Sequence, residues 1–159
     1  MFVMRRISEE DRIQVNRFLT EQWYATELIL RGERVDLKDA PGFIAFEEGE
    51  MIGLVTIRIS ECECEILSLD SLRENQGVGT ALMKKAVDAA RTAGCQKVRL
   101  ITTNDNIRAL RFYQKRGFDM VRIYHNAMDA SRKLKSAIPL IGMDGIPLKH
   151  EIEFEMDLS

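Results

Sequence analysis

The chain has 159 residues, of which 45% are apolar and 30% charged, and this composition is typical of a single soluble globular domain spanning residues 1–159. Its formal net charge of -2 argues against a nucleic-acid partner, because such proteins carry a strongly basic surface. No apolar run approaches the roughly 20 residues of a membrane span, and the first residues lack the apolar stretch of a signal peptide. We therefore expect a cytoplasmic protein that binds neither nucleic acid nor membrane.

The first half of the chain predicts one helix followed by three strands. Ser8 and Asp11 have the spacing of a capping box, and the apolar residues after them recur at helical intervals, which predicts a helix over residues 9–23. Residues 24–40 are ambiguous between a short helix and a strand with a turn. Two strands then flank a turn at residues 48–50, and a third covers residues 62–70. The short connections favour an antiparallel meander.

The second half alternates helices with strands. An amphipathic helix follows Gly77 and ends at Gly94, and a β run occupies residues 97–102. Asn104 or Asp105 can cap a second helix over residues 106–115. A strand at 118–125, a short helix at 127–136, a Pro/Gly loop at 139–148 and a final strand at 149–158 complete the chain. The β-α-β unit over residues 62–102 predicts a parallel pair with a right-handed crossover, so the fold is an α/β fold (α+β mixed sheet).

Two glycines, Gly77 and Gly79, stand one residue apart at the start of the first amphipathic helix. Main-chain N–H groups point outward at a helix start, and the helix dipole favours negative charge there. The segment is not a Walker A loop, because no Gly-Lys-Ser/Thr follows, and it lacks the third glycine of a Rossmann fingerprint. By itself it indicates either a diphosphate site of another kind or a plain tight turn.

A second segment, "NDNIRALRFYQKRGF" at 104–118, contains Asn-x-x-Ala-x-x-x-Tyr-x-x-x-Gly-Phe. Together with "SLRENQGVGTALM" before it, this segment resembles the GNAT superfamily of acyl-CoA-dependent N-acyltransferases, over about residues 43–125. The resemblance implies a GNAT-like fold: a central mixed, mostly antiparallel sheet with a splayed parallel pair and helices on both faces. It also implies acetyl-CoA as the acyl donor, with no metal.

The resemblance implies a set of cofactor contacts, residue by residue. Main-chain amides bind the CoA pyrophosphate, strand main-chain groups bind the pantetheine arm, an Asn contacts pantetheine and a Tyr lies near the thioester sulfur. These roles fall, in that order, on Gln76, Gly77, Val78, Gly79 and Thr80; on Leu67, Leu69 and Ser71; on Asn106; and on Tyr113. The chain departs from the family at Glu74, where Gln or Arg is frequent, and Arg73 and Gln76 are candidates to compensate for this acid.

Transfer of an acyl group to an amine requires the neutral amine, which an alkylamine with a pKa of about 10.4 supplies only about once in 2,500 molecules at pH 7. A general base relieves part of this cost. By the two-residue period of a strand, Glu63, Glu65, Leu67 and Leu69 share one face. We expect Glu65 to be the base, with Glu63 as the alternative; the other interpretation is that both carboxylates face solvent.

The leaving thiolate resembles a free thiol with a pKa near ~8.5, and Tyr113 is the candidate to donate a proton or a hydrogen bond to it. The alternative for Tyr113 is a buried aromatic ring whose hydroxyl bonds the backbone. No residue is placed as a covalent acyl carrier, which favours direct transfer in a ternary complex. A helical row of basic residues is either a solvated face or a contact for the CoA 3′-phosphate: Arg108, Arg111 and Lys115.

Several residues have no role in these motifs. The odd number of cysteines predicts reduced thiols, and Cys62 and Cys64 lack the further ligands of a metal site. We expect His125 and His150 to be non-catalytic. By elimination, the acceptor site is formed by Trp23, Arg31 and residues 126–150.

Three functions stay open at this point. The chain is either an N-acetyltransferase acting on a primary amine of a small molecule or peptide, an acyl-CoA-binding sensor without transferase activity, or a nucleotide-binding α/β domain. The last is weakest, because neither phosphate motif is complete. A homodimer is compatible with the sequence, and the identity of the amine acceptor cannot be read from it.

Overall fold

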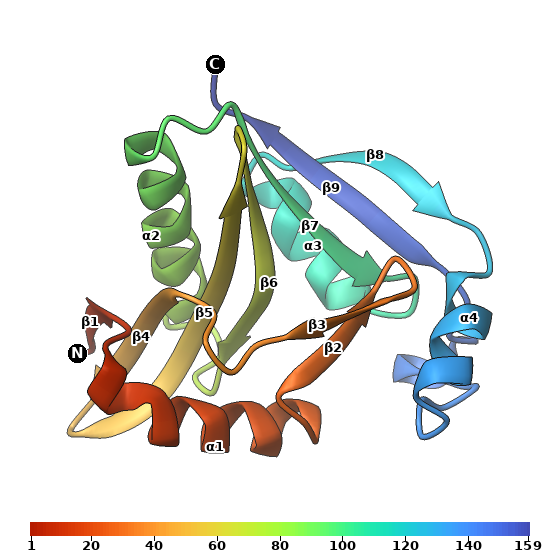
Figure 1. Ribbon diagram of the computed structural model, residues 1–159, viewed down its shortest axis with the longest axis horizontal. Helices are drawn as coiled ribbons and strands as arrows, with labels where there is room; N and C mark the ends of the chain where they lie inside the picture. Colours follow the sequence, from red (N-terminus) through yellow and green to blue (C-terminus); the bar gives the residue numbers. More distant parts are fainter. The chain divides into compact units, whose positions relative to one another are not determined.

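The computed structural model describes all 159 residues, and these fold into two compact units (Figure 1). The first unit comprises Met1–Leu28, Asp36–Val98 and Asp157–Ser159, and the second comprises Ile29–Val35 and Arg99–Met156. The fold is mixed α/β with a mostly antiparallel sheet that contains a parallel pair, so the predicted fold class is confirmed. That the whole chain acts as a single domain stays a prediction.

The strands of the first unit form the predicted antiparallel meander with one further strand at its edge. Within this unit they follow the order β1-β4-β5-β6, and each neighbouring pair is antiparallel. The edge strand β1 was not expected, because four residues that are mostly exposed carry no clear alternation. The strands are β1 (Val3–Arg6), β4 (Gly42–Glu47), β5 (Glu50–Ser60) and β6 (Glu63–Ser71).

The first predicted helix is confirmed, with its initial turn tightened to a 3-10 helix. Residues Glu9–Asp11 form η1, and α1 continues over Arg12–Trp23. The buried carboxylate of Asp11 accepts hydrogen bonds from the backbone N–H of Ser8 at 2.8 Å and from both terminal nitrogens of Arg5 at 2.5 and 2.7 Å. The Arg5 guanidinium holds the pKa of the Asp11 carboxyl well below its usual range. Asp11 therefore ties the start of the helix to β1.

The second helix of this unit, α2 (Val78–Thr92), packs its apolar stripe on β4, β5 and β6 (Figure 1). Four of the five residues of the predicted stripe are buried, and the fifth, Val87, is partly exposed; the four are Leu82, Met83, Ala86 and Ala90. Gly53 on β5 allows the first turns of the helix to come close, because a Cβ there would lie 2.9 Å from side-chain atoms of Val78 and Leu82. The helix start is thus held against the sheet by its own buried side chains.

A β-bulge in β6 overturns one sequence-based expectation. Arg58 pairs with Glu65 and Ile57 with Ile66, but the next residue, Thr56, pairs with Ser68, so Leu67 is an extra residue in β6. An extra residue reverses the direction of all side chains beyond it. Hence Glu63, Glu65, Ser68 and Asp70 share one face, and Leu69 lies on the other; the predicted common face of Glu63, Glu65, Leu67 and Leu69 is wrong beyond the bulge.

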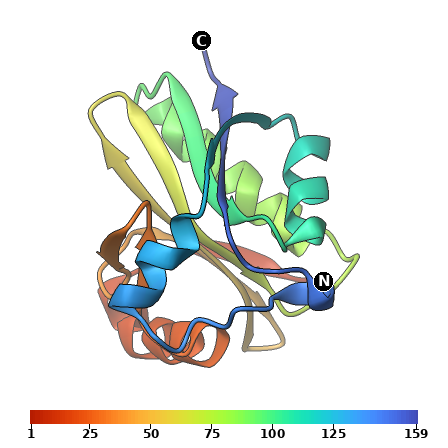
Figure 2. The ribbon, with the colours of Figure 1, turned by 90° about the vertical axis from the view of Figure 1, so that its right-hand side faces the viewer.

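The second unit holds the C-terminal part of the chain. Its strands follow the order β7-β9-β8, and β8 pairs antiparallel with β9. Figure 2 shows helix α4 and the long segment that leads from it into β9. The elements are β7 (Lys97–Thr103), α3 (Ile107–Lys115), β8 (Asp119–Tyr124), α4 (Ala127–Leu134), η2 (Met143–Gly145) and β9 (Glu151–Asp157). The first residues of β7 belong to the first unit.

The ambiguous region 24–40 is a hairpin of β2 (Glu27–Leu30) and β3 (Glu33–Asp36). Its two turn residues, Arg31 and Gly32, have φ values of 52° and 76°. Two consecutive left-handed residues match the right-handed twist of the flanking strands, which is why such a turn closes a hairpin.

No helix of the chain is both long and apolar enough to cross a membrane.

We predict that Asp11→Asn lowers the free energy of unfolding by about 2 kcal/mol at pH 7, because the buried carboxylate loses its charge-assisted hydrogen bonds to Arg5. A folded pKa below the unfolded value contributes stability above the unfolded pKa, and this contribution is lost as the pH falls. The deficit of the variant should therefore shrink as the pH falls below about 4. Urea denaturation at pH 7 and pH 3 measures it, with the exposed Glu9→Gln as control; an equal deficit at both pH values contradicts the prediction.

Candidate functional site

The predicted phosphate-binding segment joins β6 to α2 and leaves the start of the helix open. Gly77 is the N-cap of α2, with a φ of 79°, and no side chain caps the helix. The first turn contains no acidic residue. Because the first N–H groups of a helix have no partner within it, the amides of Val78 and Gly79 are available to an anion.

Of the five predicted contact residues, Val78 is held in the core and the other four are not buried. Gln76, Gly77 and Thr80 are exposed, whereas the Val78 side chain is fully buried. A Cβ added to Gly77 would meet no atom within 4 Å. The glycine is therefore required by its left-handed backbone and not by crowding within the protein, and the space beside it is open to a ligand.

The loop before Gly77 is anchored by Arg73, one of the two residues expected to compensate for Glu74. Its Nε donates to Glu47 on β4 at 3.3 Å, and its backbone N–H donates to the Ser71 hydroxyl at 3.2 Å. Glu47 also binds the N-terminal ammonium at 3.2 Å. Arg73 thus fixes the loop on β4.

Polar side chains line one face of β6, which the bulge at Leu67 aligns. Glu65 accepts from Arg58 Nη2 at 2.6 Å, and the hydroxyls of Thr56 and Ser68 lie 2.6 Å apart. Glu63 pairs with Lys97 at 3.3 Å. At the end of the row, Trp23 Nε1 of α1 donates to Asp70 Oδ2 at 2.8 Å.

The predicted base Glu65 lies on this face, with a side chain only 3% exposed. Its partner Arg58 is 45% exposed, so the ion pair lies at the boundary between solvent and the interior. The alternative, Glu63, is 35% exposed. Both carboxylates are oriented by cations, and Glu65 is the more shielded from water.

Asp70 was not among the predicted site residues. Burial raises the pKa of Asp70 to about 6, although the hydrogen bond from Trp23 opposes the shift. The two-residue period placed Asp70 on the face opposite Glu65, and only the bulge at Leu67 brings Asp70 onto the same face as Glu65. A clue in the sequence was the acid immediately after Leu69, inside the segment that the resemblance assigns to pantetheine.

In the second unit, α3 carries Asn106 and Tyr113. Asn106 is the N-cap of the helix, where its Oδ1 accepts from the Ala109 N–H at 3.1 Å. Asn104 and Asp105, which were expected to cap this helix, bond the segment before β9 instead. The side-chain amide nitrogen of Asn106 remains a donor for a ligand.

Tyr113 lies in an aromatic cluster. Its ring centroid is 5.5 Å from Phe112, 5.9 Å from Phe118 and 5.7 Å from Phe154, which holds the ring in one position. The three basic residues of this helix are all exposed, as either interpretation of them requires: Arg108, Arg111 and Lys115.

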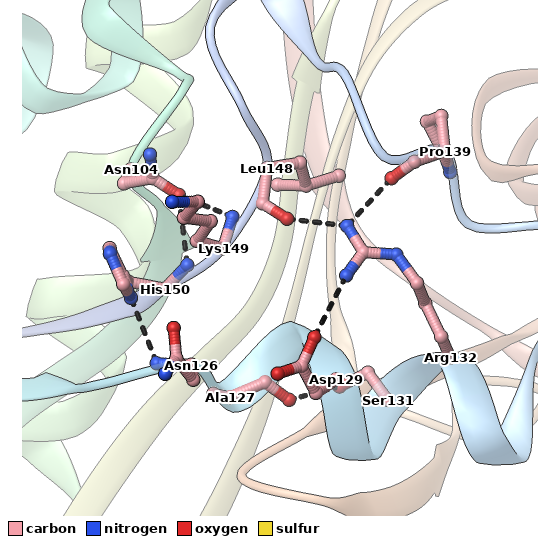
Figure 3. Close-up of polar contacts among 10 residues, drawn as sticks. All are labelled: Asn104, Asn126, Ala127, Asp129, Ser131, Arg132, Pro139, Leu148, Lys149 and His150. Carbon is pink, nitrogen blue, oxygen red and sulfur yellow. Dashed lines mark hydrogen bonds and ion pairs between the residues drawn. The ribbon is translucent and has the colours of Figure 1, made fainter.

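Residues 126–150, expected to help form the acceptor site, are held by a polar network within the second unit (Figure 3). Asn104 Oδ1 accepts from the N–H groups of Lys149 and His150, each at 2.9 Å. Arg132 of α4 donates to the carbonyl oxygens of Pro139, at 2.8 Å, and Leu148. Two side chains far apart in sequence therefore hold the C-terminal part of this segment.

Arg31, which was expected at the acceptor site, and the two histidines, which were expected to be non-catalytic, make contacts within the second unit. The Arg31 N–H donates to Glu151 Oε1 at 3.0 Å, and its Nη1 lies 3.8 Å from Glu153 Oε1. The rings of His125 and His150 stack at 4.7 Å, and His150 Nδ1 accepts from the Asn126 N–H at 2.8 Å.

Residues 6–118 match the sequence model of the acetyltransferase (GNAT) family. The chain belongs to this family. Two relatives from Bacillus subtilis (strain 168) match over most of their length. The uncharacterized protein YdhI is 41% identical over 86% of both chains, and the uncharacterized protein YxbD is 39% identical over 91% of this chain and 92% of its own. N-alpha-acetyltransferase MAK3 of Arabidopsis thaliana is 27% identical over 72% of this chain and 65% of its own.

Solved structures show the same GNAT fold. An IAA acetyltransferase from Bacillus cereus superposes with a TM-score of 0.76 at 22% identity, covering 99% of this chain and 100% of the other. A GNAT family acetyltransferase from Elizabethkingia anophelis, solved with acetyl-CoA bound, has a TM-score of 0.70 at 21% identity and covers 99% and 98%. At these identities the matches show the fold alone.

Two glycines of α2 offer a matched test of the phosphate-binding segment. Gly77 and Gly94, at opposite ends of the helix, both have a φ of 79°, and a Cβ on either meets nothing within 4 Å. Each replacement by Ala should cost about 1 kcal/mol of stability, because only the left-handed backbone is disfavoured. We predict that Gly77→Ala weakens CoA binding at least tenfold and that Gly94→Ala leaves it unchanged, as measured by calorimetry. Equal affinities would identify Gly77 as an ordinary turn residue.

We predict that Asp70→Asn raises the free energy of unfolding at pH 8 by about 1–3 kcal/mol, the value of a shift of about two pKa units. Because the folded pKa of about 6 lies above the ordinary 3.8, ionisation of Asp70 costs stability as the pH rises through about 6. The advantage of the variant should therefore vanish near pH 4. Chemical denaturation at both pH values measures it, with the exposed Asp88→Asn as control. A variant less stable than the parent at pH 8 contradicts the prediction.

Proposed function

We propose that the protein transfers an acetyl group from acetyl-CoA to a primary amine of a small molecule or peptide, directly within a ternary complex. The observation that carries the proposal is the uncapped start of α2, where the left-handed Gly77 leaves main-chain amides open, in a chain of the GNAT family. Such a helix start stabilises a diphosphate through its N–H groups and its dipole. The acetyl-CoA seen in the Elizabethkingia anophelis relative supports the choice of donor.

In the proposed complex the pyrophosphate binds the amides of residues 76–80, and the pantetheine arm bonds the main chain at Leu67, Leu69 and Ser71. The bulge supports this, because an extra residue leaves strand N–H and C=O groups outside the regular ladder. Asn106 would contact the arm through its amide nitrogen. These contacts place the thioester nearer the Glu65 end of the strand than the Ser71 end.

The proposed chemistry moves one proton before the acyl group moves. The acceptor ammonium loses one proton to the base, and the neutral nitrogen adds to the thioester carbonyl. The C–S bond breaks to release CoA thiolate, and the nitrogen loses its second proton to solvent, which gives the amide. Glu65 is the proposed base, with Glu63 as the alternative. Tyr113 donates a hydrogen bond to the departing sulfur; full proton transfer would be uphill by roughly 2 kcal/mol, because the thiol pKa is about 1.5 units lower than that of tyrosine.

A sensor that binds acyl-CoA without transferring it is the second candidate. The ion pair of Glu65 with Arg58 favours it, because a carboxylate held by a guanidinium is less ready to accept a proton. The negative charge of Glu74 lies close in sequence to the proposed diphosphate site. It disfavours binding of a phosphorylated cofactor for the enzyme and for the sensor alike.

Two measurements separate these functions. Millimolar acetyl-CoA should stabilise the fold, by about 2.7 kcal/mol at 100 times its Kd, for an enzyme and for a sensor alike. Acetyl-CoA-dependent release of free thiol with a panel of amines should occur only for the enzyme. No thermal shift with acetyl-CoA would reject both candidates, and a shift without thiol release would favour the sensor.

We predict different pH profiles for the two proposed catalytic residues. Glu65→Gln should lose most of its rate near pH 7 and recover part of it near pH 9, because the neutral amine becomes abundant without a base. Tyr113→Phe should lose about 10- to 100-fold at every pH, since only a hydrogen bond to sulfur is removed. The measurement is kcat against pH with one good acceptor. The base would be assigned to Glu63 if the kcat–pH profile of Glu65→Gln runs parallel to that of the parent and Glu63→Gln is the variant that regains rate near pH 9.

A further inference from the structure

Four carboxylates of the first unit have cationic partners, whereas Asp70 has a neutral one. Asp11 is bound by Arg5, Glu47 by Arg73 and the N-terminal ammonium, Glu63 by Lys97 and Glu65 by Arg58. The partner of Asp70 is the neutral indole N–H of Trp23. The main chain around Asp70 pairs with β5, where the residue opposite it is Leu54, a buried aliphatic side chain.

This environment makes Asp70 a charge without a counter-ion. Burial raises the pKa of Asp70 to about 6, and no charged group contributes to the shift. Above that pH the carboxyl group is an anion, half-buried beside the Trp23 ring and opposite the aliphatic Leu54. Such an anion is costly unless a cation approaches it. Because its side chain is only partly covered, a ligand can reach it.

The bulge determines where such a cation would lie. Ser68 and Asp70 share the face of Glu65, which pairs with Arg58. The residues opposite Glu65 and Asp70 on β5 are Arg58 and Leu54, which are four residues apart, or about 13 Å at about 3.3 Å per residue. Asp70 is therefore too far along the strand to take the proton of an amine that reacts beside Glu65. It is well placed for a second charge on the same acceptor.

We infer that Asp70, oriented by Trp23, binds a second positive charge of the acceptor, so that the substrate is a diamine, a polyamine or a peptide with a basic side chain. The inference rests on the proposed transferase function and deepens it. The Trp23 N–H occupies Oδ2 and leaves Oδ1 to receive an ammonium or guanidinium N–H. An acceptor with one charge would leave Asp70 uncompensated.

Kinetics with matched amines test the inference. Each diamine from 1,3-diaminopropane to 1,8-diaminooctane is compared with the monoamine of equal chain length, using acetyl-CoA as donor. For at least one length the KM of the diamine should be about 10- to 100-fold lower, the range of a charge-assisted hydrogen bond. In Asp70→Asn, which retains an acceptor for Trp23, the two KM values should converge while kcat for the monoamine stays within threefold. Asp88→Asn, which removes the same charge from the exposed face of α2, should keep the preference.

A binding readout distinguishes failure of the inference from failure of the proposed function. Trp23 is the single tryptophan of the chain, so its fluorescence reports directly on the Asp70 site without any need for catalysis. Diamines should change the emission at concentrations at which monoamines do not, and Asp70→Asn should abolish the difference. Equal responses to diamines and monoamines, or a preference retained in Asp70→Asn, overturn the inference. A diamine preference in fluorescence without thiol release rejects the transferase function and leaves the cation site standing.

Discussion

The structure of the first unit depends on one extra residue in a strand. Leu67 interrupts the pairing of β6 with β5, so the side chains before and after it change faces. Without the bulge, Ser68 and Asp70 would point toward α2, where the apolar stripe of the helix is packed. With it, Ser68 reaches Thr56 and Asp70 reaches Trp23, in line with Glu65. A continuous polar face therefore exists on a strand whose opposite face is part of the core.

The start of α2 depends on glycines used for two different physical reasons. Gly53 has no room for a Cβ, which allows Val78 and Leu82 to bury themselves against β5. Gly77 has room but adopts a left-handed backbone, which turns the chain directly from loop into helix. The buried side chains hold the helix in place, and its first main-chain N–H groups have no side-chain cap. The ion pair between Arg73 and Glu47 fixes the loop that joins β6 to α2.

Local sequence patterns predicted most of the elements, because each pattern reports an interaction between near neighbours. The capping box at Ser8 and Asp11, the helical stripe after Gly77 and the alternating strands at 42–60 were all found where expected. The short edge strand β1 carries too few residues for a period to show. The hairpin at 27–36 was ambiguous, since Arg31 adopts a left-handed conformation that its residue type does not suggest. Asn106, and not Asn104 or Asp105, caps α3, because both of the latter bond residues about 40 positions away.

The sequence by itself determined the family, the fold class and the segment that opens at Gly77, because these follow from motifs whose residues are close together in the chain. Only the tertiary structure decided which carboxylates share a face and what each one meets. Glu65 faces a cation on the neighbouring strand, and Asp70 faces an indole from a helix 47 positions earlier. A single inserted residue reverses every side chain after it, and no two-residue period reveals where the insertion falls. The pKa of Asp70 likewise follows from burial, which is a property of the packed sheet and not of the strand.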